Sequence, residues 1–324
     1  MAIRSRRGAL RGTVRLLAAT VSAAVLGAAS GCAAAHPAPR PAAQATAATG
    51  AAQARAVRLS RADAVLTSDA AALRQNWAVF GAQQVLVQQC MAKLGYRYLI
   101  TSAGPEPAAG VTTAEVAGSG SPPSYGVTAG ASPSATPAQD LYVRSMTAAQ
   151  QAAYVTALNG PRDQVAELEL PSGASSSYGT GGCLSQARAH LYGSVRAALE
   201  SAFVPQDVEQ LFARSLSTDQ PYQTAVTAWQ RCMAASGQQA QTPAVLIDSL
   251  QAQAAEGVRA SILTIRQKVA AGDDLACDAR TGLRRTLARQ QALFLEQQPQ
   301  QTLSVLDQVW QARQSAAAQA AARS

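Results

Sequence analysis

The sequence predicts a mainly α fold: an irregular multi-helix bundle with a small β-hairpin, divided into two disulfide-linked halves. Three observations lead to this expectation. Apolar residues recur at spacings of three, four and seven over much of the chain, as they do on helices with one buried face. Only one stretch alternates between apolar and polar residues in the manner of a half-buried strand. Four cysteines beyond the N-terminal segment fall into two similar modules.

Residues 1–31 have the parts of an export signal. Five arginines and no acidic residue precede the apolar run Leu16–Ala29. This run is shorter than the ~20 residues needed to cross a bilayer, so it predicts a lipoprotein signal peptide and not a spanning helix. The run Ala29-Ser30-Gly31-Cys32 resembles a bacterial lipobox. Cys32 is therefore expected to begin the mature chain and to carry the lipid.

An anchor at Cys32 would place the protein on the outer face of the cell membrane. Two or more acyl chains on one residue hold a protein stably, at ~0.8 kcal/mol per buried CH2. The pair Arg6-Arg7 resembles a partial twin-arginine signal, although Ala9 stands where an aromatic or bulky residue is usual. Export by the general secretory route and export by the twin-arginine route both stay open.

Charge argues against a nucleic-acid partner. The full chain has a formal net charge of +8. Because the signal carries five of the arginines, the mature chain keeps only +3. A high pI that belongs partly to a discarded segment does not indicate nucleic-acid binding.

Composition divides the rest of the chain into a tether and two helical halves. Residues 32–60 are rich in alanine and proline and are expected to form a flexible tether. The halves follow at 61–202 and 203–324, the second with long C-terminal helices. Residues 102–139 are mostly Gly, Pro, Ser, Thr and Ala, which predicts a mobile loop within the first half.

Caps, prolines and glycines set the expected helix limits. Ser68 is a candidate N-cap for a helix that Gly95 ends, and Thr147 with Gln150 resembles a capping box. The tail after Arg313 is expected to fray. Helices are expected at about 68–94, 147–158, 183–202, 205–216, 221–236, 242–272, 273–298 and 299–313, with a bend as the alternative to an end at 272.

One region has the pattern of a hairpin. Val165–Leu170 alternates, Pro171-Ser172-Gly173 is a turn signal, and Ala174–Gly179 is the expected return strand. Two strands alone are marginally stable. Tyr96–Ile100 is therefore a candidate third strand.

The four remaining cysteines predict a disulfide framework. An even number in an exported chain indicates disulfides, and four cysteines allow three connectivities. Free buried thiols and a metal site are the alternatives. The sequence contains no Cys-x-x-Cys pair, which argues against structural zinc.

A repeat favours one of the three connectivities. The segments 90–95 and 232–237 share Cys-Met-Ala-x-x-Gly, and each follows an apolar helix that contains a tryptophan. Each is followed by a second cysteine on a later helix. This arrangement predicts the pairs Cys90–Cys183 and Cys232–Cys277, one in each half.

The same segments resemble a family of uncharacterised actinobacterial (Streptomyces-type) secreted lipoproteins. Its members combine a lipobox with a Cys-Met-x-x-x-Gly-aromatic turn, a Gly-Cys helix that ends in Leu-Tyr-Gly, and a Cys-x-x-x-Thr-Gly-Leu helix. The matching segments here are 90–98, 182–193, 229–233 and 277–283. The resemblance implies an extracytoplasmic, disulfide-bonded helical protein and brings no activity. Gln238 departs from the aromatic position, so the second turn is expected to pack differently.

The sequence contains few of the residue patterns that catalytic sites require. After the tether the chain has a single histidine, His190, and no nucleophile elbow, P-loop or dinucleotide motif. Glu167 and Glu169 share one face of a strand, where a solvated surface is favoured over a carboxylate pair. Asp273 and Asp274 are interpreted as helix-cap residues. We therefore expect no catalytic residues, no metal and no cofactor.

One basic stripe remains. Its members are Arg280, Arg284, Arg285 and Arg289. A solvated helix face is the favoured interpretation, and contact with anionic lipid or a wall polymer is the alternative.

The sequence thus indicates a lipid-anchored extracytoplasmic protein that acts by binding or scaffolding at the cell envelope. Its expected partners are the membrane, through the lipid anchor, and a cell-wall polymer or envelope protein. The alternative is an envelope enzyme with a carboxylate-based site that no motif reveals.

Overall fold

The computed structural model of the chain describes residues 42–67, 70–100, 124–127 and 138–323. The predicted signal peptide and Cys32 lie outside these residues. The chain divides into units 1–47 and 48–324. Apart from the start of the first helix, all that follows concerns the second unit.

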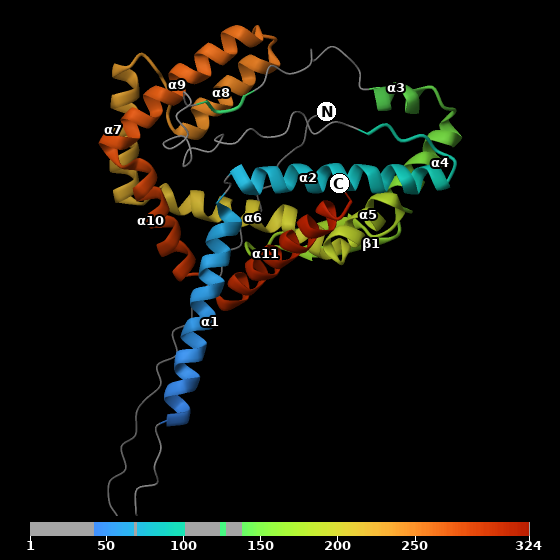
Figure 1. Cartoon of the computed structure of the whole chain (residues 1–324), viewed down its shortest axis with the longest axis horizontal. Coiled ribbons are helices and arrows are strands. Elements are labelled where there is room, and N and C mark those ends of the chain that lie inside the picture. Colours follow the sequence, from blue (N-terminus) through green and yellow to red (C-terminus); the bar gives the residue numbers. More distant parts are fainter. Residues whose placement is uncertain (1–41, 68–69, 101–123, 128–137, 324) are drawn as a thin grey trace, which may run out of the picture. The chain divides into compact units, whose positions relative to one another are not determined.

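The fold class is confirmed: the described residues are mainly helical, with one two-stranded antiparallel sheet and two disulfides. No described helix is long and apolar enough to cross a membrane. The elements in chain order (Figure 1) are α1 Ala42–Leu66, α2 Ala70–Lys93, α3 Ala138–Arg144, α4 Ala148–Asn159, β1 Val165–Glu169, β2 Ser175–Gly179, α5 Gly182–Tyr192, α6 Val195–Leu216, α7 Gln220–Ala235, α8 Pro243–Ala255, α9 Ala260–Thr281, α10 Leu283–Glu296 and α11 Gln300–Ala321.

The hairpin forms as predicted, but without a third strand. Val165 pairs with Gly179 and Glu169 with Ser175, and Leu168 points into the core. Residues 96–100 have no strand partner, because glutamine side chains bind their backbone instead. The Leu99 N–H donates to Gln139 Oε1 at 2.7 Å, and the Tyr98 carbonyl accepts from Gln88 Nε2 at 3.0 Å.

The expected tether is helical from residue 42 onward, within α1. Alanine has the highest helix propensity, which favours this outcome, and the last turns of α1 are also held by packing. Ala62, Val65 and Leu66 are buried against α6, α10 and α11. Arg61 forms an ion pair with Asp307 at 2.7 Å on α11. The described part of the expected tether, from residue 42 onward, is therefore an α-helix.

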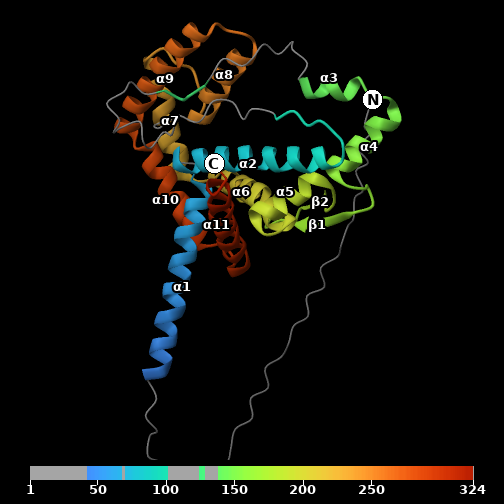
Figure 2. The ribbon, with the colours of Figure 1, turned by 45° about the vertical axis from the view of Figure 1, so that its right-hand side comes forward.

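The two halves each have a core, and two further clusters join them. One cluster surrounds the first disulfide on α2, α4 and α5, and another surrounds the second disulfide on α7, α8 and α9. The third packs α1 and α6 on α10 and α11. The fourth packs α2 and α5 on the end of α11, which lies beside α2 in Figure 1 and Figure 2. The boundary at residues 202 and 203 falls inside α6 and does not separate two cores.

The helix limits near residue 200 differ from the prediction. Gly193, with φ of +81°, ends α5, and Ser194 caps α6 by accepting from the Ala197 N–H. Pro205 was expected to open a helix but lies inside α6.

A distant arginine compensates for this interior proline. Pro205 has no N–H to donate to the Ser201 carbonyl one turn earlier. Arg313 Nη2 donates to that carbonyl at 2.9 Å. Its Nη1 donates to the Val65 carbonyl, in the last turn of α1, at 3.1 Å. Arg313 thus supplies hydrogen bonds that two helices lack, and burial lowers its pKa.

Glycines also reposition the helix limits in the second half. The expected helix 242–272 divides into α8 and α9 at Gly257, whose φ is +83°. Gly272 lies inside α9 and neither ends it nor opens the next helix. The break before α10 comes at Gly282, with φ of +66°. Positive φ, which glycine adopts without steric cost, marks both breaks.

Two segments expected to be loose are packed in their described parts. Within the predicted loop 102–139, the Tyr125 side chain is buried against α9, and Val127 exchanges two backbone hydrogen bonds of 2.9 Å with the Gln267 side chain. The tail after Arg313 is the end of α11, where Ala316 is fully buried. Small side chains allow this tail to pack closely, so it does not fray.

Candidate functional site

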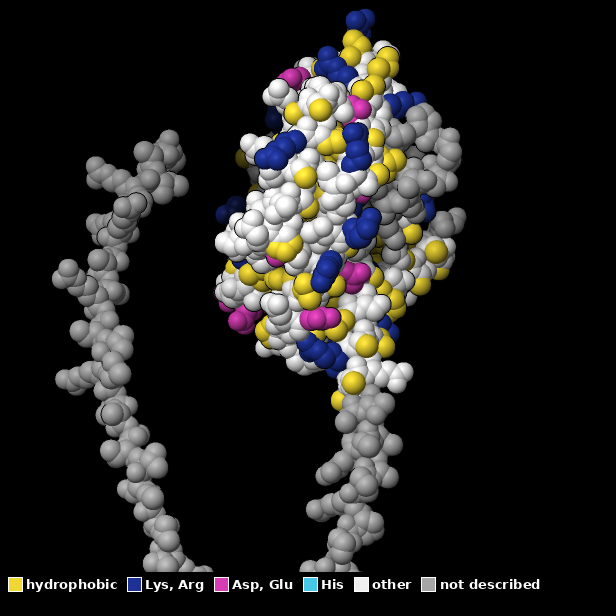
Figure 3. Space-filling view, turned by 90° about the vertical axis from the view of Figure 1, so that its left-hand side faces the viewer, with side chains coloured by type: hydrophobic (Ala, Val, Ile, Leu, Met, Phe, Trp, Pro, Cys, Tyr) yellow, Lys and Arg dark blue, Asp and Glu magenta, His cyan; other side chains and the backbone are white. Residues whose placement is uncertain are grey.

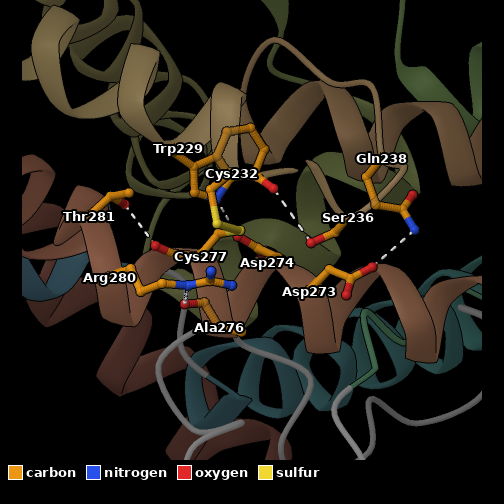
Figure 4. Close-up of a disulfide and its surroundings, with 10 residues drawn as sticks. All are labelled: Trp229, Cys232, Ser236, Gln238, Asp273, Asp274, Ala276, Cys277, Arg280 and Thr281. Carbon is orange, nitrogen blue, oxygen red and sulfur yellow. Dashed lines mark hydrogen bonds between the residues drawn. A yellow bond between two sulfur atoms is a disulfide. The ribbon is translucent and has the colours of Figure 1, made fainter. Parts of the chain in front are cut away.

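Both predicted disulfides are present. Cys90 bonds Cys183 and Cys232 bonds Cys277, with Cα–Cα distances of 5.6 and 5.7 Å. Each bond joins the end of a tryptophan-bearing helix to a later helix of the same half. Figure 4 shows the second bond with Trp229 beside it.

The two modules end their helices with the same hydrogen bonds. The Gly95 N–H donates to the Ala92 carbonyl and the Tyr96 N–H to the Met91 carbonyl, and the corresponding pairs recur at 234–237 and 233–238. This is a Schellman motif in both modules. Met91 and Met233 are each fully buried beneath it. The sequence repeat is therefore a structural repeat.

The residues that follow the two glycines have different partners. Tyr96 lies edge-on to Tyr154, with ring centroids 5.5 Å apart. Burial and nearby tyrosines raise the pKa of Tyr154 to about 12. In the second module, Gln238 donates to Asp273 Oδ2 at 3.2 Å. The expected difference in packing follows from this exchange of an aromatic ring for an amide.

The second module surrounds a buried carboxylate. Asp274 accepts from Trp229 Nε1 at 2.9 Å and from the Tyr125 hydroxyl at 2.6 Å. It also forms an ion pair with Arg284, which contacts Asp278 as well. Burial opposes the charge on Arg284, but hydrogen bonding and the charge of Asp274 outweigh it, so its pKa is raised. Burial and Asp274 also raise the pKa of Tyr125.

This network is structural. Both oxygens of Asp274 are occupied by protein donors, and the residue is 1% exposed. Asp273 and Asp274 lie inside α9, so their interpretation as helix caps is wrong. A carboxylate with all its partners in the protein, away from solvent, is not poised for acid–base chemistry.

The four arginines do not form one helical stripe. Arg280 lies on α9, and Gly282 separates it from the others on α10. Arg284 is turned inward by its carboxylate partners, which leaves Arg280, Arg285 and Arg289 exposed. Figure 3 shows the side of the molecule that carries α7 and α10, where basic side chains are spread singly with acidic ones among them.

Other candidate residues are solvent-facing. Glu167 and Glu169 both lie on the exposed face of β1, as expected of a solvated strand. His190 is exposed near the end of α5, where the Arg323 guanidinium lies against its Nε2. Among the described residues, no group of three or more His, Cys, Asp or Glu side chains is placed to hold a metal ion.

The feature that the sequence did not reveal is a groove between α2 and the end of α11. Its volume is about 710 Å³, which is within the ~300–1,000 Å³ of ligand pockets. Trp77, Val85 and Gln89 of α2 line it with Arg323. The other wall residues are mostly small: Ala78, Gly81, Ala82, Ala317, Ala320 and Ala321.

Small residues explain why the groove exists. Two packed helices close the space between them only where side chains interdigitate. The floor is closed in this way by Val79 and Leu191 together with Ala316. Above it, the alanines of both helices and Gly81 of α2 are too short to fill the gap. Trp77 is half-buried at the groove wall.

A smaller hollow of about 260 Å³ is lined by residues of α2 and α5. Gln89 lines both this hollow and the groove, and the Arg323–His190 contact joins their walls. Lys93 and His190 line the smaller hollow beside Cys90. Among the residues that the structure describes, no Asp or Glu lines either space. The basic groups are thus gathered at one end of an apolar groove.

Comparisons of the chain with models of protein families, with curated proteins and with solved structures gave no match.

Proposed function

We propose that this chain is a lipid-anchored protein of the outer face of the cell membrane that binds a long-chain acyl group in the α2/α11 groove. The groove is the observation that carries the binding proposal. Membership of the lipoprotein family, export and the anchor at Cys32 rest on the sequence of the N-terminal segment and on the cysteine modules. The paired cysteines are compatible with an oxidising compartment.

The dimensions of the groove suit an extended apolar chain. Its α2 wall runs from Gln75 to Gln89, which is ~21 Å along a helix at ~1.5 Å per residue. Each methylene group buried there contributes about 0.8 kcal/mol. Trp77 offers a broad apolar surface at the wall, and the alanines let a chain approach the helix backbones closely.

Binding is favoured over catalysis because the buried carboxylate has no free oxygen. Asp274 is held by Trp229, Tyr125 and Arg284, so it lacks a position for a substrate. Glu169 lines a separate hollow of about 270 Å³ with Glu200, whose carboxylate forms an ion pair with Arg196 at 2.7 Å. Because Glu200 already accepts a hydrogen bond from Arg196, this pair supports the enzyme alternative less well than the α2/α11 groove supports binding.

The groove is tested with Gly81→Leu in the mature chain carrying Cys32→Ser, which has no acyl group of its own. A Cβ at Gly81 meets no atom within 4 Å, and Gly81 lines the groove, so a leucine there occupies groove space and favours the helix. Palmitate binding, measured by equilibrium dialysis, should weaken roughly tenfold or more, because two or more methylene groups lose their site.

Gly50→Leu is the matched control. Gly50 is an exposed helical residue of α1, and its added Cβ also meets no atom within 4 Å. This variant should bind palmitate as the parent does. Equal binding by the Gly81 and Gly50 variants, or no palmitate binding by the parent, would reject the groove as the binding site.

The anchor is tested separately in cells. Cys32→Ala should leave unprocessed precursor or release the protein into the medium, because the residue that carries the lipid is missing. Fractionation followed by immunoblotting measures this. A variant that is cleaved and membrane-bound as before would refute the anchor and leave the groove proposal standing.

A further inference from the structure

We infer that the groove selects a single-chain amphiphile with an anionic carboxylate head, a long-chain fatty acid, and that Lys93, His190 and Arg323 receive this head. The inference rests on the proposed acyl-binding function and adds the chemistry at one end of the groove.

Among the described residues, the charged side chains at that end, Lys93 and Arg323, are both cationic. Arg323 lines the groove, and Lys93 and His190 line the hollow that shares Gln89 with it. Within the described part of the chain, no acidic side chain lines either space, although many lie elsewhere. Cationic side chains without a carboxylate partner beside an apolar groove complement a ligand that is apolar along its length and anionic at one end.

The arrangement of these groups suits a head at the rim. All three side chains are exposed, so a carboxylate that binds there keeps part of its hydration, while the alkyl chain lies between α2 and α11. Arg323 offers a planar fork that matches a carboxylate in two hydrogen bonds, and Lys93 adds a point charge. His190 contacts Arg323 and orients its guanidinium.

The elements that carry these groups are held together. Lys93 lies in the last turn of α2, one helical turn after the Cys90–Cys183 bond that ties α2 to α5. His190 lies two turns along α5 from Cys183. Arg323 follows the end of α11, which packs on both helices. The disulfide therefore fixes the distance between two of the three head contacts.

The test compares palmitate with methyl palmitate, whose chain is the same and whose head is neutral. Both are measured against the mature Cys32→Ser chain, the double variant Lys93→Gln/Arg323→Gln and the control Arg289→Gln, which removes an exposed arginine of α10. Exposed charge pairs contribute roughly three- to fivefold each. The parent and Arg289→Gln should prefer palmitate roughly tenfold over the ester.

The double variant should lose this preference and still bind the ester. Parent binding of palmitate should also weaken with added salt, because exposed charges are screened. Equal affinity of the parent for the two ligands, or a double variant that keeps the preference, would overturn the head assignment alone. Absence of binding by both ligands would overturn the acyl-binding function on which it rests.

Discussion

The two cysteine modules have the same backbone and different surroundings. Each ends a helix with a Schellman motif over a buried methionine, and each ties that helix to a later one. The second module encloses Asp274, whose carboxylate is held by three donors within the protein. The first borders the α2/α11 groove and the hollow that contains Lys93 and His190.

This difference shows the same structural unit in two different environments. In the second module, the disulfide and the ion network stabilise a core, and both oxygens of Asp274 are held by protein donors. In the first half, the disulfide holds α2 against α5, and other residues of α2 line the groove. We therefore place binding in the first half, together with the end of α11.

The largest expected effect is the loss of a disulfide. Replacing both cysteines of a pair by serine should lower the free energy of unfolding by about 4–5 kcal/mol for either module, because the closed loops are long. Sequence separations of 93 and 45 residues make the first loss slightly larger. Urea unfolding of the two double variants measures it. A loss below about 1 kcal/mol for one pair would show that the modules are not equivalent.

The next largest effect is specific to the second module, because it concerns the buried carboxylate of Asp274. Asp274→Ala leaves the Trp229 N–H, the Tyr125 hydroxyl and Arg284 without their acceptor, which should cost about 3 kcal/mol. Asp273→Ala is the neighbouring control and loses one hydrogen bond to Gln238, so it should cost about 1 kcal/mol or less. Denaturant unfolding compares the two variants. Equal losses would contradict a buried network centred on Asp274.

A smaller effect should be the same in both modules. Gly95 and Gly237 have φ of +80° and +83°, and an added Cβ at either meets no atom within 4 Å. Alanine at each should therefore cost about 1 kcal/mol through backbone strain alone.

Gly81→Ala is the control for these two glycines. Gly81 lies in the helical conformation of α2, so this change should be neutral or should stabilise the fold by about 0.5–1 kcal/mol. Thermal unfolding measures all three variants. A cost at Gly237 that exceeds the cost at Gly95 by more than about 1 kcal/mol would argue against a common turn.

Local signals in the sequence predicted local structure well. The Thr147 capping box forms with Gln150, the hairpin closes at its predicted turn, and the shared Cys-Met-Ala-x-x-Gly pattern identified both disulfide pairs. Each of these features depends on residues close in sequence or on a repeat of such residues. Helix caps and turns depend on residues a few positions apart, so they can be predicted from the sequence without knowledge of the fold.

Features that depend on distant residues were missed. Pro205 looked like the start of a helix because Arg313, which binds the carbonyl it frees, is far away in the chain. Asp274 looked like a cap because its partner Tyr125 lies in a stretch that resembled a loop. The groove results from side chains that are too short to fill the space between α2 and α11. An alanine-rich composition gives no signal of where such a gap occurs.

The most direct test of acyl binding in the groove uses the fluorescence of Trp77. Of the three tryptophans, Trp77 alone lines the groove; Trp229 is fully buried and Trp310 lies beneath Arg61. Palmitate brominated on its alkyl chain quenches tryptophan by contact. Saturating brominated palmitate should quench part of the emission of the mature Cys32→Ser chain and should leave the emission of its Trp77→Phe variant nearly unchanged. Equal quenching of the two proteins, or none in the parent, would contradict an acyl chain bound between α2 and α11.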